Sequence, residues 1–187
     1  NLVNLYKAGK LSEALSMGNL LLEKHPCHPA LLNLIGMIND GLGIHGLAVQ
    51  YLERVIKLKP YEEKIYYNLA KVLKKIKKPA TAEKNMRRAA LISPTFSNIY
   101  NELAVQKIEL DEHDQALVNG KRAVATRPTD HNAYNNVGVA RRGLNENSLA
   151  KLNYKLALLL KPDHQSSLNN FANLLKNEGH IDCAISN

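Results

Sequence analysis

The sequence predicts an all-α chain built from antiparallel helix pairs that repeat along its length. One observation is a proline series with a constant spacing of 34 residues: Pro26, Pro60, Pro94, Pro128 and Pro162. Another is an alanine series with the same spacing: Ala14, Ala48, Ala82, Ala116, Ala150 and Ala184. The composition is rich in Leu, Ala, Lys and Asn and has no Trp, which favours helices over strands. Two residue types that keep one register indicate an internal repeat.

The proline series sets the boundaries of the repeats. We number the positions of a repeat as places, with the proline at place 32. This numbering predicts a single solenoid over residues 1–187, with two partial and four complete repeats: 1–28, 29–62, 63–96, 97–130, 131–164 and 165–187. Each complete repeat is long enough for two helices of three to four turns, which are marginally stable alone.

The first repeat begins within a helix, which the pattern places at residues 1–8. Gly9 predicts the turn that follows, because glycine tolerates the left-handed conformation in which helices often end. Ser12 is the predicted cap of the second helix. That helix ends before Pro26, because proline lacks the amide hydrogen that a helix needs at this point.

The second and third repeats show the pattern of packing residues. Leu or Tyr stands at place 4, Ile or Leu at place 7, a small residue at place 8 and Ala at place 20: Leu32, Ile35, Gly36 and Ala48, then Tyr66, Leu69, Ala70 and Ala82. Small residues at places 8 and 20 let two helices approach closely. The third repeat has Lys77-Lys78-Pro79 at its turn, and Pro79 suits the first turn of a helix.

The remaining repeats keep this register. Repeat four reads Tyr100, Leu103, Ala104 and Ala116, repeat five reads Tyr134, Val137, Gly138 and Ala150, and repeat six opens with Leu168, Phe171 and Ala172. In repeat four, Asp114 is the predicted cap of the second helix. Repeat six begins at Gln165.

These residues resemble the tetratricopeptide repeat family over the whole chain. The resemblance rests on Leu or an aromatic residue at place 4, small residues at places 8, 20 and 27, and proline at place 32. It implies a right-handed superhelix and a module that binds proteins. It also implies that places 2, 5, 6, 9, 12 and 13 of the first helix of each repeat line a concave groove.

Asparagine recurs at the predicted groove places. The candidates at places 5, 6 and 9 are Asn33, Asn68, Asn101, Asn135, Asn136, Asn169, Asn170 and Asn173. An amide offers a donor and an acceptor, so it can pair with the backbone of an extended peptide. The series resembles the asparagine ladder of the O-GlcNAc transferase repeat domain, although Leu34 and Glu102 interrupt it. The alternative is that these asparagines only solvate an exposed face.

Much of the positive charge lies in repeat three. The net charge is +8, and residues 63–96 hold nine lysines and arginines against two glutamates. Lys64, Lys71 and Lys75 fall at groove places, and Arg142 does so in repeat five. They predict a basic segment that attracts acidic peptides; the alternative is a solvated face. We expect no nucleic-acid partner, because few aromatic residues interleave the lysines for base stacking.

The sequence predicts no enzyme and no cofactor in this chain. No nucleophile elbow, phosphate loop or HExxH motif is present. His25, Cys27 and His28 are close in sequence, but a metal site needs a further ligand. Cys27 and Cys183 stand near opposite ends, so a disulfide between them is not expected, which fits a reducing compartment such as the cytoplasm. The longest apolar run is too short to span a membrane.

The predicted function is therefore a protein-interaction module that binds an extended, acidic peptide segment in its concave groove. The alternative is a substrate-recognition segment of a larger glycosyltransferase or sulfotransferase, because residues 21–60 are similar to bacterial repeat regions attached to such enzymes. A third expectation concerns the ends. Leu2, Leu5, Ile181 and Ile185 lack a covering repeat, and exposed apolar ends can drive end-to-end association.

Overall fold

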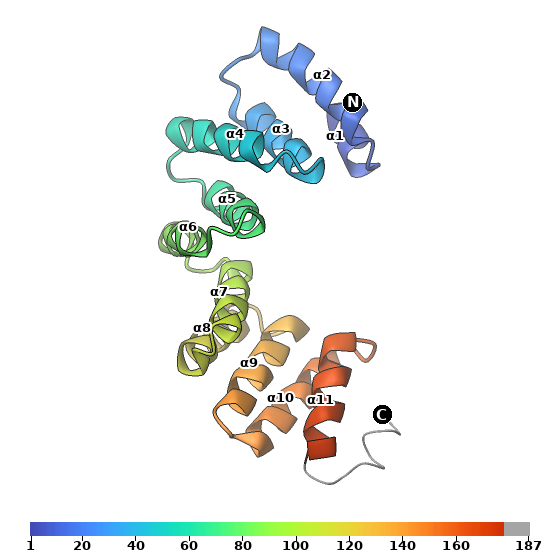
Figure 1. The fold of residues 1–187 in the computed structure, drawn as a ribbon, viewed down its shortest axis with the longest axis vertical. Helices are drawn as coiled ribbons and strands as arrows, with labels where there is room; N and C mark the ends of the chain where they lie inside the picture. Colours follow the sequence, from blue (N-terminus) through green and yellow to red (C-terminus); the bar gives the residue numbers. More distant parts are fainter. Residues whose placement is uncertain (178–187) are drawn as a thin grey trace. The chain divides into compact units, whose positions relative to one another are not determined.

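The computed structural model describes residues 1–177 and contains eleven helices there (Figure 1). Their bounds are α1 Leu2–Lys7, α2 Leu11–Lys24, α3 Pro29–Gly41, α4 His45–Leu58, α5 Glu63–Lys75, α6 Pro79–Ile92, α7 Ser97–Glu109, α8 His113–Thr126, α9 His131–Gly143, α10 Asn147–Leu160 and α11 Gln165–Asn177. No strand occurs in this part of the chain, so the all-α prediction is confirmed.

The chain forms two compact units, residues 1–94 and residues 95–187. Unit 1 holds α1 to α6, and unit 2 holds α7 to α11 within its described part. The boundary falls directly after Pro94, in the turn between α6 and α7. Each unit has its own buried residues.

Within each unit, a helix packs most closely against the next helix of the chain, as in α3 with α4 and α9 with α10 (Figure 1). The described alanines at place 20 lie at the centre of this packing and are all fully buried: Ala14, Ala48, Ala82, Ala116 and Ala150. Their small side chains permit the close approach that the sequence predicts. Larger side chains, such as Leu52 and Tyr154, fill the space beside them.

The glycine at place 8 of repeat five shows how tight this packing is. A Cβ atom on Gly138 would lie 2.5 Å from Cε1 of Tyr154, whose ring is fully buried. The equivalent Cβ on Gly36 would lie 3.3 Å from Cγ of Leu52. Place 8 therefore excludes a side chain in repeat five and nearly accommodates one in repeat two.

The turn inside each helix pair repeats one backbone conformation. A left-handed residue stands at place 15 of five successive repeats: Gly9, Gly43, Lys77, Asp111 and Asn145. The next helix begins two residues later in each case. This confirms the turn predicted at Gly9 and the helix start at Pro79.

The same geometry corrects two predicted caps. The helices α2 and α8 begin at Leu11 and His113, so Ser12 and Asp114 lie inside their first turns and do not cap them. The reason is that the left-handed residue brings the chain into the helical conformation two residues earlier than the side-chain pattern suggests.

The N-terminal apolar residues differ from expectation. Leu2 is buried against Ala14 and Ile38, and Leu5 packs against the same cluster, because α2 and α3 cover this face of α1. The expectation that Leu2 is exposed is therefore wrong. Ile181, Cys183, Ala184 and Ile185 lie outside the described residues. End-to-end association stays a prediction.

None of the helices in residues 1–177 is both long enough and apolar enough to cross a lipid bilayer.

Candidate functional site

The predicted groove asparagines form a regular set of hydrogen bonds within each unit. In each case Nδ2 of the asparagine at place 6 donates to Oδ1 of the asparagine at place 5 in the preceding repeat. The three pairs are Asn68 to Asn33 at 3.3 Å, Asn136 to Asn101 at 3.4 Å, and Asn170 to Asn135 at 3.1 Å. At the remaining step the sequence has Tyr67 and Glu102 in place of the two amides.

The pair in unit 1 is half-buried and keeps hydrogen-bonding capacity. Asn33 and Asn68 stand on the first helices of their repeats, α3 and α5. Their mutual bond uses one acceptor oxygen of Asn33 and one N–H of Asn68. Nδ2 of Asn33 donates to no other residue of the described chain, and Oδ1 of Asn68 accepts from none. This pair therefore presents a donor and an acceptor to a ligand.

The amides of unit 2 are more enclosed. Asn135 and Asn136 are each only 8% exposed, and Asn101 is half-buried. Both polar groups of the Asn101 side chain are used within the chain, because Oδ1 accepts from Asn136 and Nδ2 donates to Asp130. Farther along, Asn170 is half-buried, while Asn169 and Asn173 are exposed on α11. Asparagines at equivalent places of different repeats therefore differ in how far the chain encloses them.

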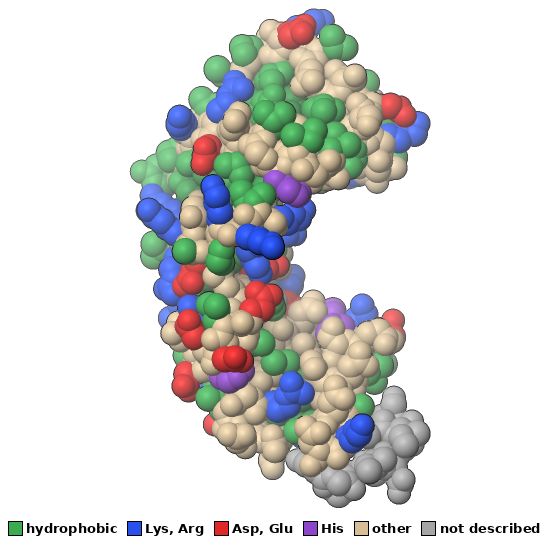
Figure 2. Space-filling model, viewed as in Figure 1, with side chains coloured by type: hydrophobic (Ala, Val, Ile, Leu, Met, Phe, Trp, Pro, Cys, Tyr) green, Lys and Arg blue, Asp and Glu red, His purple; other side chains and the backbone are tan. Residues whose placement is uncertain are grey.

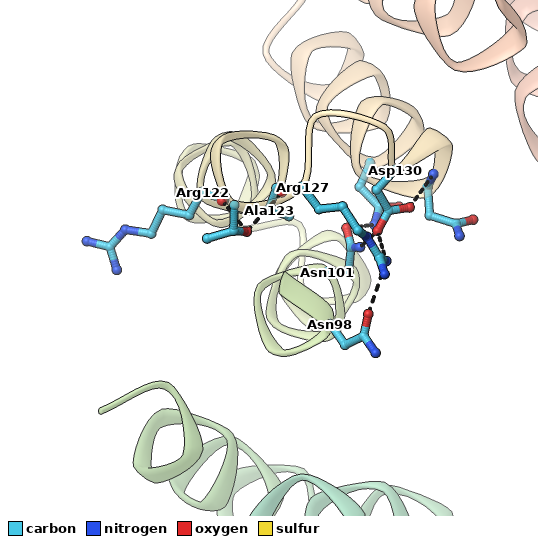
Figure 3. Close-up of polar contacts among 9 residues, drawn as sticks. Asn98, Asn101, Arg122, Ala123, Arg127 and Asp130 are labelled. Carbon is cyan, nitrogen blue, oxygen red and sulfur yellow. Dashed lines mark hydrogen bonds and ion pairs between the residues drawn. The ribbon is translucent and has the colours of Figure 1, made fainter. Parts of the chain in front are cut away.

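A buried carboxylate organises the hydrogen bonds around Asn101 (Figure 3). Asp130 is 4% exposed and accepts hydrogen bonds from Nδ2 of Asn101 at 2.7 Å, from the backbone N–H of Asn132 at 3.0 Å, and from Arg127. Arg127 also donates to Oδ1 of Asn98 at 3.1 Å. Burial raises the pKa of Asp130, but the hydrogen bond and charge of Arg127, with the other donors, outweigh it and hold the pKa below its usual value.

A second polar cluster lies at the same place of the next repeat. Nδ1 of His164 lies 2.7 Å from Oγ of Ser167, and Ser167 donates to Oδ1 of Asn135 at 3.2 Å. Ser167 is fully buried, so its hydroxyl serves the packing and is closed to a substrate. Burial lowers the pKa of His164, and the charges of His131 and Lys161 lower it further against the opposing effect of Asp163 and Asp130.

The predicted basic residues have different surroundings. Lys75 forms an ion pair of 2.6 Å with Asp40, a carboxylate that also contacts Nδ1 of His45 at 3.0 Å. Nζ of Lys71 lies 5.7 Å from the centre of the Tyr67 ring. Lys64 is exposed and lines a cavity beside Asn33. The charge of Lys75 is thus compensated within the chain, whereas Lys64 keeps its charge for a ligand.

Arg142 lies near a buried tyrosine in unit 2. Burial raises the pKa of Tyr154 to about 12, and the positive charge of Arg142 opposes this rise. Arg142 is half-buried, so it contributes less accessible charge than Lys64.

Three cavities open on unit 1, and none of them was predicted from the sequence. One, of about 830 Å³, is lined mainly by residues of α6, and the other two have corresponding linings in successive repeats. Of these two, the first cavity, about 300 Å³, is lined mainly by apolar atoms of Val3, Leu21, Leu31 and Leu34 with two histidines. The second cavity, about 220 Å³, has a mixed lining, with the polar side chains of Asn33, Lys59, Glu62 and Lys64 beside apolar groups such as Val55 and Ile65. Five lining positions of the two cavities correspond across one repeat: Leu21 and Val55, His25 and Lys59, His28 and Glu62, Ala30 and Lys64, Leu31 and Ile65. A comparison of places 27, 31, 34, 2 and 3 between repeats would have found this correspondence.

Charge is distributed unevenly over the surface. Figure 2 shows hydrophobic side chains gathered over the N-terminal helices and Lys and Arg side chains over α5 and α6. Within residues 1–177, no three or more His, Cys, Asp or Glu side chains converge as metal ligands would. The cluster of His25, Cys27 and His28 therefore forms no such group.

Paired helices of constant length, with a repeated turn and a repeated polar contact, define the chain as an α-solenoid of helix hairpins. The family model of the tetratricopeptide repeat matches residues 29–62 and 63–96, the bounds that the proline register predicts for repeats two and three. The tetratricopeptide interpretation is supported, whereas the resemblance to the O-GlcNAc transferase repeat domain stays a prediction.

Solved structures extend the likeness to most of the chain. The MamA fragment 41-end from Desulfovibrio magneticus RS-1 is 16% identical, with 84% of this chain and 89% of that chain covered and a TM-score of 0.75. YrrB, described as a TPR protein with an unusual peptide-binding site, is 19% identical, with 90% and 87% covered and a TM-score of 0.71.

A chain of the APC/C hetero-tetramer Cut9–Hcn1 is 18% identical and has a TM-score of 0.80, with 99% of this chain but 37% of that chain covered. At these identities the likeness shows the fold, and it confirms the predicted class of tetratricopeptide-type solenoid. Comparison with curated protein sequences gives no significant match.

Proposed function

We propose that this chain is a protein-interaction module that binds an extended segment of a partner protein across α3 and α5 of unit 1. The observation that carries the proposal is the half-buried pair of Asn33 and Asn68. Their mutual hydrogen bond fixes both amides and leaves one donor and one acceptor for a ligand. An extended peptide offers a C=O and an N–H to match them.

Two features of this face favour a peptide as the ligand. First, the hydrogen bond between the amides orients both side chains before binding, which reduces the entropy lost when a ligand is held. Second, such amides pair with the peptide backbone, so they tolerate many ligand sequences. Selectivity must then come from the side chains around the pair.

The charge beside the pair favours an acidic segment. Lys64 lines the cavity that contains Asn33, and Lys71 is exposed one turn after Asn68. Lys75 contributes less, because Asp40 compensates its charge. Positive charge on the binding face raises the rate of association with an acidic segment, and salt weakens this effect.

The fold is compatible with this proposal. YrrB, which shares the fold, is described as having a peptide-binding site. Solenoids of this kind present extended surfaces to their partners. For the present chain, the residues on which binding depends are Asn33, Asn68, Lys64 and Lys71.

The test is selection from a library of random peptides displayed on phage, followed by measurement of affinity for the selected peptides by fluorescence anisotropy. Asn68→Ala removes one hydrogen-bonding amide, so we expect a loss of affinity of about three- to tenfold. Asn85→Ala is the matched control, because Asn85 bonds only the Thr81 carbonyl on the second helix of the same repeat. Equal affinities for the two variants would contradict the proposal, and so would a library without binders.

A further inference from the structure

The first and second cavities described above are adjacent copies of one structural position with different chemistry. Both include Ala30 in their lining, and their other shared positions lie one repeat apart. This inference rests on the proposed function: we propose that the first and second cavities are successive side-chain subsites for one extended ligand. The first takes a bulky aliphatic side chain, and the second takes a carboxylate about three residues away.

The first subsite is suited to an aliphatic side chain. Val3, Leu21, Leu31 and Leu34 supply its walls, and Val3 is 43% exposed, so apolar surface there remains in contact with water. Place 6 holds Leu34 here, whereas three other repeats have an asparagine at this place. Burial of a leucine-sized side chain removes apolar surface from water on both partners.

The second subsite offers donors and positive charge. Lys59 and Lys64 stand beside the amide of Asn33, and Glu62 is the only acid in the lining. Nδ2 of Asn33 donates to no other residue of the described chain. An incoming carboxylate would therefore find two ammonium groups and one amide N–H.

Unit 2 supplies an internal precedent for this chemistry. At the equivalent position of repeat four, the cation at place 31 and the amide at place 5, Arg127 and Asn101, both donate to the carboxylate of Asp130. The corresponding residues of repeat two are Lys59 and Asn33. The same pair of donors therefore holds a carboxylate of the chain itself in unit 2 and stands open in unit 1.

Glu62 occupies the place that corresponds to Asp130 but is not bound in the same way. Among the described residues, none donates a hydrogen bond to its carboxylate, and it does not cap α5. It therefore opposes an incoming acid by charge repulsion. Removal of this charge is expected to raise the affinity for an acidic ligand, whereas the affinity for a purely apolar ligand should not change.

The spacing follows from the geometry of the elements. Neighbouring packed helices lie about 8–10 Å apart, and an extended chain advances about 3.3 Å per residue. A ligand that crosses from the first cavity to the second therefore advances by about three residues. Shorter separations would leave one subsite empty.

The experiment uses an array of glycine–serine peptides that each carry one leucine and one glutamate, at every separation and in both orders. We expect the strongest binding at a separation of about three residues and in one order only. Replacement of leucine by alanine should weaken binding about tenfold, and replacement of glutamate by glutamine about threefold at low salt.

Variants of the protein assign the subsites. Lys64→Glu should abolish the preference for glutamate, and Glu62→Gln should raise affinity for the glutamate peptide about threefold. Lys121→Glu is the matched control, because it makes the same charge change on an exposed residue of unit 2. Leu34→Asn should abolish the preference for leucine, and Val3→Ser serves the same purpose if Leu34→Asn fails to fold.

The outcomes separate this inference from the proposed function. Selected peptides that bind but show no dependence on the leucine, the glutamate or their separation would overturn the two subsites and leave the binding module intact. Absence of any binding peptide would overturn both. An unchanged glutamate preference in Lys64→Glu would refute the second subsite alone.

Discussion

The two units place the same residue types at the same repeat positions and use them differently. In unit 2, the position between successive first helices is filled by the chain's own polar groups, Asp130 with Arg127 in one repeat and His164 with Ser167 in the next. In unit 1, the corresponding positions are open cavities. Asn101 and Asn135 are therefore part of the internal packing of unit 2, whereas Asn33 of unit 1 is accessible to a ligand.

The difference originates at places 31 and 34. Arg127 and Asp130 form a close ion pair, and Asp130 caps α9 through the backbone N–H of Asn132. Lys59 and Glu62 have the same charges, but no hydrogen bond or ion pair joins the carboxylate of Glu62 to any described residue. A carboxylate on a shorter side chain can cap the helix and meet the amide of Asn101 at once. The shorter carboxylate at place 34, together with the arginine at place 31, closes the pocket from within.

Removal of the Asp130 carboxylate is the strongest way to break this comparison. Asp130→Ala leaves Arg127, Asn101 and the α9 N-terminus without their acceptor, and we expect a loss of about 3 kcal/mol in the free energy of unfolding. Glu62→Ala should cost less than about 0.5 kcal/mol, because that carboxylate is not bonded. Urea unfolding followed by circular dichroism measures both. Similar losses for the two variants would show that the units use this position alike.

The glycines at place 8 of repeats five and two give a second contrast, at the level of single repeats. Gly138→Ala forces a Cβ against the buried ring of Tyr154, and we expect a loss of about 2 kcal/mol from overpacking. Gly36→Ala meets Leu52 at 3.3 Å, so a small adjustment of the leucine limits the loss to less than about 1 kcal/mol. Thermal unfolding compares the two variants. A larger loss for Gly36→Ala would contradict the packing described here.

The sequence predicts the repeats well because their signal is local. Proline at place 32 and alanine at place 20 fix where helices end and where they approach, and both follow from the chemistry of single residues. The caps at Ser12 and Asp114 were wrong because the left-handed residue at place 15, which need not be glycine, sets the helix start. Lys77 at that place carries no sequence signal of its own.

The candidate site is predicted less completely because its character depends on pairs of residues. The position of Asn135 at a groove place gives no sign that Ser167 and Asn170 will enclose it. Nor does the lysine run predict that Asp40 will compensate Lys75. These partners lie about one repeat away, so their contacts require the helix spacing as well as the pattern.

Low pH should lower the stability of unit 2 through the hydrogen-bond cluster around Asp130. The pKa of Asp130 is lowered in the folded chain, so the ionised carboxylate stabilises the fold above the unfolded pKa of about 3.9, and this contribution is lost as the pH falls through the folded pKa. Asp130→Asn removes the titration. We expect the stability difference between the natural chain and this variant to shrink steadily as the pH is lowered below about 5.

His164 should cause a separate loss of stability as the pH falls, and this loss begins at a higher pH than that of Asp130. Its pKa is lowered in the folded chain, so protonation favours the unfolded state, and the stability present above about pH 6.5 is lost as the pH falls toward the folded pKa. His164→Gln should therefore flatten the pH dependence of stability below about pH 6.5 while leaving the acid limb in place. If the dependence of stability on pH were the same in both variants as in the natural chain, these clusters would not be its cause.

The smallest expected effect concerns the turn at place 15. Lys77 has a φ of 57°, a left-handed conformation that is costly for a long side chain that cannot hydrogen-bond the local backbone as Asn or Asp can. Glycine adopts this conformation without steric cost but loses more backbone entropy on folding. Lys77→Gly should therefore stabilise the chain by about 0.5–1 kcal/mol, and Gly43→Lys, at the equivalent turn, should destabilise it by a similar amount. Urea unfolding midpoints measure both changes. Since these turns have the same conformation in neighbouring repeats, opposite signs are required, and a shift of the same sign would show that the turn does not control the stability of unit 1.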